Sequence, residues 1–321
     1  MENKAKSGVF KYQHSWSITQ TLENLIEALR KGWDISISTS GSSGVPKEIL
    51  IPASAMIFNA RNTNNYLNAK SGNRWSLLLS PEHTAGLNVL VRSIELGTTP
   101  VTQNESAEFT AIVPTQLFRA LNGDSQLLKH LQGCQAVLVG GAAADEKLLA
   151  AANEKQINCV TTYGMTETSG GCVYNGVPLP GVEIRVNETI EIKGPMLARV
   201  PLKDGFFVTS DLGKLEVGKL IVLGRADDVI NSGGKKVSLS KVENALGETF
   251  AAFGTENSEW GAALNIATTG NMSDEEIQLV LSVKFGVKAL QIYRVNEIPR
   301  TALEKIDRQA LINKLVSYPS E

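Results

Sequence analysis

Residues Ser38–Lys47, with the sequence STSGSSGVPK, combine hydroxyl side chains, glycines and a final lysine. Glycines let a backbone approach a ligand closely, and successive N–H groups with nearby hydroxyls can bind anionic oxygens. The lysine adds a positive charge suited to phosphate. Because Asp34–Ile37 and Glu48–Ile51 alternate and are β-branched as strands are, we expect a loop between two strands. The sequence therefore predicts a phosphate-binding hairpin.

This stretch differs from a Walker A loop, which has the pattern G-x-x-x-x-G-K-[ST] and opens a helix. Gly41 and Gly44 are too close together for that pattern, and Pro46 precedes the lysine. Glu48 stands where Ser or Thr would hold Mg²⁺. A flexible Gly/Ser turn without a ligand remains the alternative interpretation.

Two further groups of residues directly follow predicted strands. Gly140-Gly141-Ala142 follows the strand at 135–139, and TTYGMTET at Thr161–Thr168 overlaps the end of the strand at 158–162. Parallel sheets bind ligands at the carboxyl ends of their strands. The small residues suit a shelf for a purine, and Glu167 beside bound phosphates suits Mg²⁺, which takes few protein ligands. A purely structural Tyr-Gly turn is the alternative for the second group.

Three charged residues nearer the C-terminus each have a functional and a structural interpretation. Asp211 ends a strand-like run, where a carboxylate can accept ribose hydroxyls or cap a turn. Arg225 can reach a ribose or pair with Asp227 or Asp228. Lys305 has the plain interpretation of a solvated surface lysine. The residues alone leave these alternatives open.

Composition limits the class of protein. The chain has 321 residues, 42% hydrophobic and 20% charged, enough for a sizeable core and two domains. A net charge of −2 argues against nucleic acid as a partner. We expect no signal peptide, because Met1–Trp16 is polar, and no membrane span. Cys134, Cys159 and Cys172 are isolated, so we expect a cytoplasmic protein without disulfides or a zinc site.

Periodicity predicts the fold class as α/β. Helices at 17–31, 52–68, 114–121 and 145–155 alternate with apolar strands such as 75–79, which is typical of a parallel sheet. Ser54 is the expected N-cap of the helix at 52–68. After Gly171, short strands between prolines predict a small antiparallel unit. From about Arg225 onward, mixed helices and strands predict a small α+β domain. We therefore expect a core domain at 1–225 and a second domain at 226–321.

Five motifs occur in a fixed order: STSGSSGVPK, GGAAAD, YGMTET, TSDLGKLEVGKLIVLGRADDVINSGGKKVS and IPRTALEKIDR. With them the chain resembles the adenylate-forming superfamily of acyl-CoA synthetases, adenylation domains and luciferases. Three segments, SPEHTAGLNVLVR, IVPTQLFRAL and TYGMTETSGGCVYNGVPLPGVEI, are similar to the short form of the o-succinylbenzoate–CoA ligases of menaquinone biosynthesis. Since 38 residues precede Thr39, the resemblance implies a shortened N-terminal lobe.

The resemblance implies a ligase that uses ATP, Mg²⁺ and coenzyme A. A substrate carboxylate attacks the α-phosphorus, pyrophosphate leaves, and the CoA thiol then displaces AMP from the acyl-adenylate. Positioning and charge neutralisation suffice for such chemistry, which fits the lack of a Ser/His/Asp or Cys/His arrangement. Two alternatives are another aryl or acyl acid as substrate, and a nucleotide-binding protein without turnover. Oligomeric state is left open.

The same resemblance implies which residues would contact the phosphates, the adenine, the Mg²⁺ ion and the ribose. The β- and γ-phosphates would lie against Thr39, Ser40, Gly41, Ser42, Ser43, Gly44 and Lys47. The adenine would be lined by Gly140, Gly141, Ala142 and Tyr163, with Gly164 beside the ring. Thr166 would touch the α-phosphate, Glu167 would bind Mg²⁺, and Asp211 with Arg225 would hold the ribose.

The remaining roles belong to the acid pocket and to the second domain, which acts as a lid. His83 would gate the acyl pocket, with Gly170, Gly171 and Ser80–Leu87 as walls, and Arg92 follows at a typical spacing. Lys305 would reach the α-phosphate and the attacking carboxylate. Rotation at Asp227 would withdraw it and bring Gly233 and Gly234 to the pantetheine tunnel. Ser210 and Glu304 depart from the family, which usually has glycine at both positions.

Overall fold

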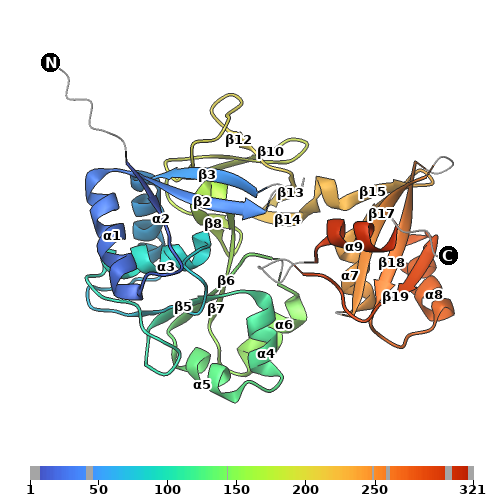
Figure 1. The fold of residues 1–321 in the computed structure, drawn as a ribbon, viewed down its shortest axis with the longest axis horizontal. Coiled ribbons are helices and arrows are strands. Elements are labelled where there is room, and N and C mark those ends of the chain that lie inside the picture. The colour runs from blue at the N-terminus through green and yellow to red at the C-terminus, as the bar shows by residue number, and fades with distance from the viewer. Residues whose placement is uncertain are drawn as a thin grey trace. The chain divides into compact units, whose positions relative to one another are not determined.

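The structure is a computed structural model that describes residues 8–40, 46–142, 144–247, 249–257, 261–300 and 306–316 (Figure 1). Its contacts divide the chain into two compact units. Unit 1 comprises Met1–Thr209 and Lys214–Ile221, and unit 2 comprises Ser210–Gly213 and Val222–Glu321. The ribbon of β13 (Asp211–Glu216) and β14 (Lys219–Arg225) contributes to both. The cut at 225/226 stays a prediction.

The main sheet of unit 1 has six strands in the order β4-β5-β6-β7-β8-β9. Their bounds are β4 (Trp75–Ser76), β5 (Phe109–Ile112), β6 (Ala136–Val139), β7 (Cys159–Met165), β8 (Gly170–Tyr174) and β9 (Val177–Pro178). Strands β4 to β7 are parallel, whereas β8 and β9 are antiparallel. Every residue of β5 and β6 is buried, as expected for strands covered on both faces. The predicted α/β fold with a parallel sheet is confirmed.

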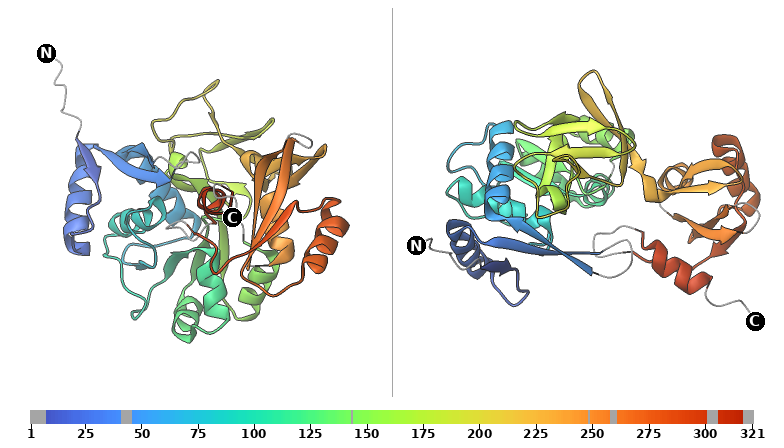
Figure 2. Two further views of the ribbon diagram at one scale, coloured as in Figure 1. Left: turned by 45° about the vertical axis from the view of Figure 1, so that its right-hand side comes forward. Right: turned by 90° about the horizontal axis from the view of Figure 1, so that it is seen from above.

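Helices cover both faces of this sheet (Figure 1 and Figure 2). On one face, Val89 of α3 (Thr84–Glu95) packs with Trp75, Phe109 and Leu138. On the other face, α4 (Pro114–Leu121), α5 (Ser125–Gly133) and α6 (Glu146–Glu154) share a core with residues of β5 and β6. Strand side chains alternate between the two faces, so β5 and β6 contribute to both cores. Helix α3 also packs against α2 (Ala53–Tyr66).

A second sheet of unit 1 carries the predicted phosphate-binding hairpin. It has the order β1-β2-β3, with β1 (Val9–Lys11) parallel to β2 (Asp34–Ser40) and β2 antiparallel to β3 (Pro46–Pro52). Helix α1 (Ile18–Lys31) precedes β2, as predicted. It begins with a capping box between Ser17 and Gln20 and ends at Gly32, whose φ of 67° suits glycine. The predicted small antiparallel unit is confirmed as β10 (Glu183–Val186), β11 (Ile190–Lys193) and β12 (Phe207–Val208).

Local predictions were wrong at two places. Ser54 was expected to cap α2, but Pro52 occupies the N-cap position and Ser54 lies in the first turn. A fixed φ makes proline suitable for a helix start, which the expectation did not consider. The strand expected at 75–79 is limited to β4, because Leu77 donates to the Val101 carbonyl (2.9 Å) and the chain then leaves the ladder.

Unit 2 is a mixed sheet with three helices in its described part. The order is β16 (Lys235–Ser238), β15 (Val229–Ser232), β18 (Gly261–Thr268) and β17 (Phe250–Asn257), with β19 (Gln291–Arg294) parallel to β18. The helices are α7 (Leu239–Leu246), α8 (Asp274–Phe285) and α9 (Arg308–Leu315). Among the helices of the described ranges in both units, none is long and apolar enough to cross a bilayer.

A buried ion cluster joins three segments of unit 2. Arg308, at the start of α9, contacts Asp228 (3.0 Å) and donates two hydrogen bonds to Glu243 of α7 (2.9 and 2.8 Å). Glu243 also accepts from the Ala252 backbone (2.9 Å), and Asp228 from the Ser240 backbone (2.9 Å). The cluster therefore fixes α9 to the segment that follows the β13–β14 ribbon.

This cluster predicts a pH dependence of stability. Burial raises the pKa of Glu243 from its ordinary 4.5 to about 7, although Arg308 opposes the shift. The folded state thus holds more protons than the unfolded state between these values, so stability falls as pH rises through them. We expect this part of the pH dependence, on the order of 3 kcal/mol, to be absent in Glu243→Gln. Urea unfolding at pH 5 and pH 8 measures it, with exposed Glu275→Gln as control; an unchanged pH dependence in Glu243→Gln would contradict the prediction.

Candidate active site

The predicted phosphate-binding loop joins two paired strands, as expected. In the hairpin, Thr39 pairs with Lys47 and Ser40 with Pro46, and the Thr39 hydroxyl donates to the Lys47 carbonyl (3.2 Å). Gly41, Ser42, Ser43 and Gly44 lie outside the described residues. The hydroxyl of Ser36 donates to Glu48 and lowers its pKa, with a smaller effect from Lys11 (3.3 Å). The Glu48 carboxylate thus forms its hydrogen bonds within the sheet, whereas Lys47 is exposed.

The hairpin lies beside the turn that carries Thr166 and Glu167. Strand β3 contacts η1 (Thr166–Thr168), a single 3₁₀ turn at the end of β7. One short segment ties both together: the Ala198 N–H donates to the Glu167 carbonyl (2.8 Å), and the Arg199 N–H to the Leu50 carbonyl (2.8 Å). Arg199 also donates to both Asp34 oxygens (2.6 and 2.9 Å). Two motifs far apart in sequence therefore lie side by side.

Glycine is required where β7 turns into η1. The register between β7 and β8 shifts between Tyr163 and Gly164. A Cβ at Gly164 would lie 2.1 Å from the Gly170 carbonyl oxygen, so a side chain there would force the two strands apart. The Thr168 hydroxyl donates to that same carbonyl (2.7 Å) and accepts from the Met165 N–H (2.9 Å). These bonds fix the turn that presents Thr166 and Glu167.

The small residues after β6 lie next to this turn. Val139 pairs with Thr161, which places Gly140 beside Thr162 at the carboxyl ends of neighbouring strands. A Cβ at Gly140 would lie 2.2 Å from the Thr162 hydroxyl, so glycine allows the close approach. Gly141 and Ala142 are exposed. The structure thus brings the predicted adenine shelf to the same edge as the Tyr163–Glu167 segment.

The N-terminus of α3 completes the site in unit 1. His83 occupies the N-cap position in an extended conformation and is half-buried. Next to it, the Thr84 hydroxyl donates to the Thr166 hydroxyl (2.9 Å). A Cβ at Gly86 would lie 2.1 Å from the Ser80 carbonyl oxygen, so the Ser80–His83 loop packs directly on the first turn of α3. His83 therefore lies close to the predicted α-phosphate contact.

Arg92 is buried in a polar network that sequence reasoning missed. Its side chain is 4% exposed, its Nη2 lies 3.5 Å from the Tyr174 hydroxyl, and its guanidinium lies over the Trp75 ring. The Thr63 and Tyr174 hydroxyls bond at 2.8 Å. Burial lowers the pKa of Arg92 and raises that of Tyr174. Within the described ranges no carboxylate forms an ion pair with Arg92, and its Nε has no hydrogen-bond partner. The sequence signal for this site was a charged residue that directly follows the apolar run Val89–Val91.

Unit 2 holds the other predicted residues. Arg225 Nη1 lies 3.6 Å from Asp211 Oδ1, so the two predicted ribose ligands lie together. Asp228, the alternative partner of Arg225, contacts Arg308. Gly233 and Gly234 form the turn between β15 and β16 with φ of 59° and 80°, a conformation that favours glycine. Lys305 and the side chain of Asp227 lie outside the described residues.

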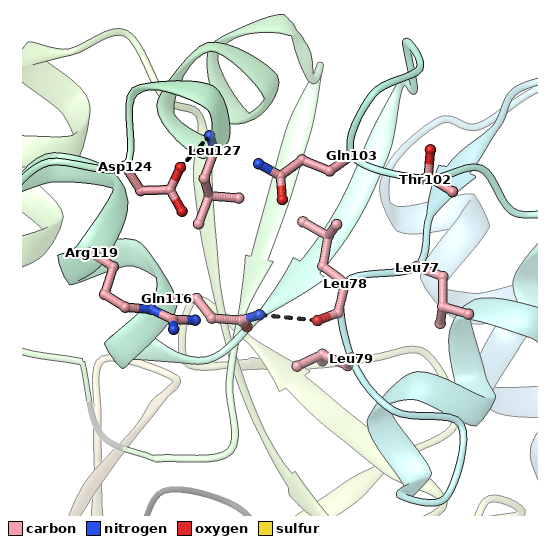
Figure 3. Close-up of a pocket in the computed structure, with 9 residues that line it drawn as sticks. All are labelled: Leu77, Leu78, Leu79, Thr102, Gln103, Gln116, Arg119, Asp124 and Leu127. Carbon is pink, nitrogen blue, oxygen red and sulfur yellow. Dashed lines mark hydrogen bonds between the residues drawn. The ribbon is translucent and has the colours of Figure 1, made fainter. Parts of the chain in front are cut away.

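One cavity lies elsewhere in unit 1 (Figure 3). It has a volume of about 480 Å³ and is lined by Leu77, Leu78, Leu79, Thr102, Gln103, Gln116, Arg119, Asp124 and Leu127. Figure 3 shows the Gln116 amide donating to the Leu78 carbonyl (2.9 Å) across one side of it. The predicted site residues are not among those that line it, so we do not assign the nucleotide to this cavity.

Comparison with known proteins identifies the family. Residues 35–196 match the AMP-binding enzyme family. A probable 2-succinylbenzoate–CoA ligase from Mycobacterium tuberculosis (strain H37Rv) is 37% identical over 344 residues, covering 91% of this chain and 88% of the relative. The chain belongs to the AMP-binding enzyme family. The predicted resemblance to adenylate-forming enzymes is thereby confirmed.

Other members of the AMP-binding enzyme family support the same relationship. The 2-succinylbenzoate–CoA ligase of Escherichia coli (strain K12) is 30% identical and covers 65% of this chain and 51% of the relative. The structure of o-succinylbenzoate CoA synthetase (MenE) from Bacillus subtilis with the acyl-adenylate OSB-AMP has a TM-score of 0.75, 24% identity, and coverage of 86% of this chain and 68% of that chain. This structural likeness shows the shared fold.

Proposed function

We propose that this protein is an ATP-dependent o-succinylbenzoate–CoA ligase that acts in menaquinone biosynthesis. In the first half-reaction, the substrate carboxylate oxygen attacks the α-phosphorus and pyrophosphate leaves. In the second, the CoA sulfur attacks the acyl carbon and AMP leaves with the bonding electron pair. The observation that supports the proposal most is the meeting of the β2–β3 hairpin, the Thr166–Glu167 turn and the start of α3 in one place. The M. tuberculosis relative bears the same activity in its name.

The phosphates would lie between the hairpin and the turn. The Thr39 and Ser40 end of β2 and the exposed Lys47 would face the β- and γ-phosphates, with the intervening Gly41–Gly44 supplying backbone N–H groups. The half-buried Glu167 carboxylate would take Mg²⁺, which keeps most of its coordination for water and phosphate oxygens and neutralises their charge. The Thr166 hydroxyl would donate to the α-phosphate.

The adenine would lie against Gly140–Ala142, and the ribose would bind residues of unit 2. Gly140, Gly141 and Ala142 leave room for the adenine plane beside Tyr163. The paired Asp211 and Arg225 would hold the ribose hydroxyls. We assign Lys305 to the α-phosphate and the attacking carboxylate, where negative charge accumulates during adenylation. Rotation at Asp227 would exchange Lys305 for Gly233 and Gly234 in the second half-reaction.

o-Succinylbenzoate carries a second carboxylate that does not react. We propose that the positive charge of Arg92 attracts this carboxylate. A guanidinium that is 4% exposed and lacks an acidic partner in the described part of the chain is costly unless a negative charge comes near. Gly170 and Gly171, on the strand that also holds Tyr174, would form the wall between Arg92 and the acid. A low dielectric there would strengthen the attraction.

We place the reaction in the cytoplasm. ATP and coenzyme A, the two co-substrates, are cytoplasmic metabolites. Cys134, Cys159 and Cys172 are free thiols, which fits a reducing compartment.

Product analysis tests the proposed function. Purified protein with ATP, Mg²⁺, coenzyme A and o-succinylbenzoate should yield AMP, pyrophosphate and o-succinylbenzoyl-CoA, each dependent on the acid. Mass spectrometry identifies the thioester, and benzoate, which lacks the second carboxylate, is the matched control acid. Turnover with other acids but not with o-succinylbenzoate would show that the proposed substrate is wrong. ATP binding without release of pyrophosphate in the presence of any acid would show that the protein is not an adenylating enzyme.

A further inference from the structure

Thr84, predicted only as part of the Ser80–Leu87 wall of the acid pocket, is a buried residue that contacts Thr166 directly. It is the first residue of α3 and is 6% exposed, and its hydroxyl donates to the Thr166 hydroxyl at 2.9 Å. The two residues are 82 positions apart in sequence. One turn further along α3, Asn88 donates from Nδ2 to the Ser169 carbonyl (2.7 Å). The first two turns of α3 thus hold the η1 turn and the residue after it.

The hydrogen bond from Thr84 leaves the Thr166 hydroxyl able to donate a hydrogen bond to a ligand. A hydroxyl has one proton and two lone pairs, and accepting from Thr84 uses one lone pair while the Thr166 proton stays available. The neighbouring hydroxyls are engaged within the protein, since Thr168 donates to the Gly170 carbonyl (2.7 Å) and Ser169 to the Met196 carbonyl (2.6 Å). Of the three, Thr166 is the one whose proton is not used in a hydrogen bond among the described residues.

Tight packing keeps this arrangement in one geometry. Gly170 has a φ of 101°, and a Cβ there would lie 2.5 Å from Asn88 Nδ2 and 3.8 Å from Thr84 Cγ2. Helix α3 therefore lies directly on the Ser169–Gly170 backbone. A hydroxyl that already accepts one fixed hydrogen bond has fewer orientations left for its proton and loses less freedom when it meets a ligand, which is the benefit of preorganisation.

We propose that Thr84 is a positioning residue for adenylation: it holds the Thr166 hydroxyl so that its proton faces the α-phosphate. Because Thr84 directly follows His83, the same turn of α3 borders the acid and orients the phosphate donor. The α-phosphate is the point where acid and nucleotide react, so both are aligned by one rigid element. This inference rests on the proposed function, in which Thr166 contacts the α-phosphate.

Thr84→Val tests the role, because it replaces the hydroxyl by a methyl group of similar size. We expect kcat for o-succinylbenzoate-dependent pyrophosphate exchange to fall about 10-fold, less than the ~10²–10³ for losing a donor outright, with KM for ATP nearly unchanged. Thr84→Ser keeps the hydroxyl and should restore the rate. Thr110→Val is the matched control, since Thr110 is buried in β5 and donates to the Ser76 carbonyl (3.2 Å) away from the site.

A double-mutant cycle separates positioning from general destabilisation. If Thr84 acts through Thr166, Thr84→Val should cause no further loss in a Thr166→Val background. Equal losses in both backgrounds, or a wild-type rate in Thr84→Val, would overturn the positioning role while leaving the proposed function intact. If the wild type uses a different acid, the cycle is run with that acid. A wild type that turns over no acid would overturn both.

Discussion

Lys305→Ala should lose adenylation by at least ~10²–10³-fold while still converting supplied o-succinylbenzoyl-adenylate and coenzyme A to the thioester. The side chain is assigned to the charge that accumulates as the carboxylate attacks the α-phosphorus, and this attack occurs only in the first half-reaction. Pyrophosphate exchange measures the first step, and release of AMP from the synthetic adenylate measures the second. A large loss in one assay alone is the signature of a residue used in one half-reaction.

The Lys305→Ala substitution does not remove any residue of the ion cluster that holds α9 in unit 2. The chain after Lys305 is anchored at Arg308 by Asp228 and Glu243, so unit 2 keeps its buried ion cluster in the variant. Lys288→Ala removes an exposed lysine of the same unit and should leave both rates unchanged. Equal losses of the two half-reactions in Lys305→Ala would contradict the assigned role, because they would indicate a structural effect.

Glu167→Gln should lower the adenylation rate by about 10²-fold at ordinary Mg²⁺ concentration and shift the Mg²⁺ dependence to higher values. The substitution keeps the shape of the side chain and removes its charge. The backbone of the turn should stay in place, because the Glu167 carbonyl accepts from Ala198 regardless of the side chain. Titration of pyrophosphate exchange with Mg²⁺ gives both quantities.

Glu188→Gln is the matched control for this variant. Glu188 is exposed on the turn between β10 and β11, so its charge should not affect the Mg²⁺ dependence. A Glu167→Gln enzyme that needs no more Mg²⁺ than the wild type would contradict the metal assignment. A parallel loss in Glu188→Gln would indicate that net charge, rather than this position, governs the effect.

The sequence predicted the elements whose determinants are local. Helix α1 is an example, because Ser17, Gln20 and Gly32 form both of its caps within one stretch. The hairpin is another, since its strands alternate and its loop composition is distinctive. Helix α5 was not predicted: its start depends on one cap, Asp124 accepting from the Leu127 N–H (2.9 Å), and it follows α4 after a short turn.

Contacts between distant segments could not be predicted in the same way. The Thr84–Thr166 hydrogen bond joins α3 to the η1 turn, and the group of Thr63, Tyr174 and Arg92 joins α2 and α3 to β8. No spacing rule relates these positions, because the sheet order and the packing of α2 and α3 bring them together. The motifs indicated which residues form the site, while tertiary packing determines how each one is held.

The central claim is that the hairpin, the Thr166–Glu167 turn and the start of α3 form one site for the nucleotide triphosphate. A crystal structure with Mg²⁺ and a non-hydrolysable ATP analogue tests it most directly. The account predicts the β- and γ-phosphates between the β2–β3 hairpin and the Thr166–Glu167 turn, Mg²⁺ on the Glu167 carboxylate, and the Thr166 hydroxyl on the α-phosphate. A nucleotide bound elsewhere, for example in the cavity beside α4 and Leu78, would contradict it.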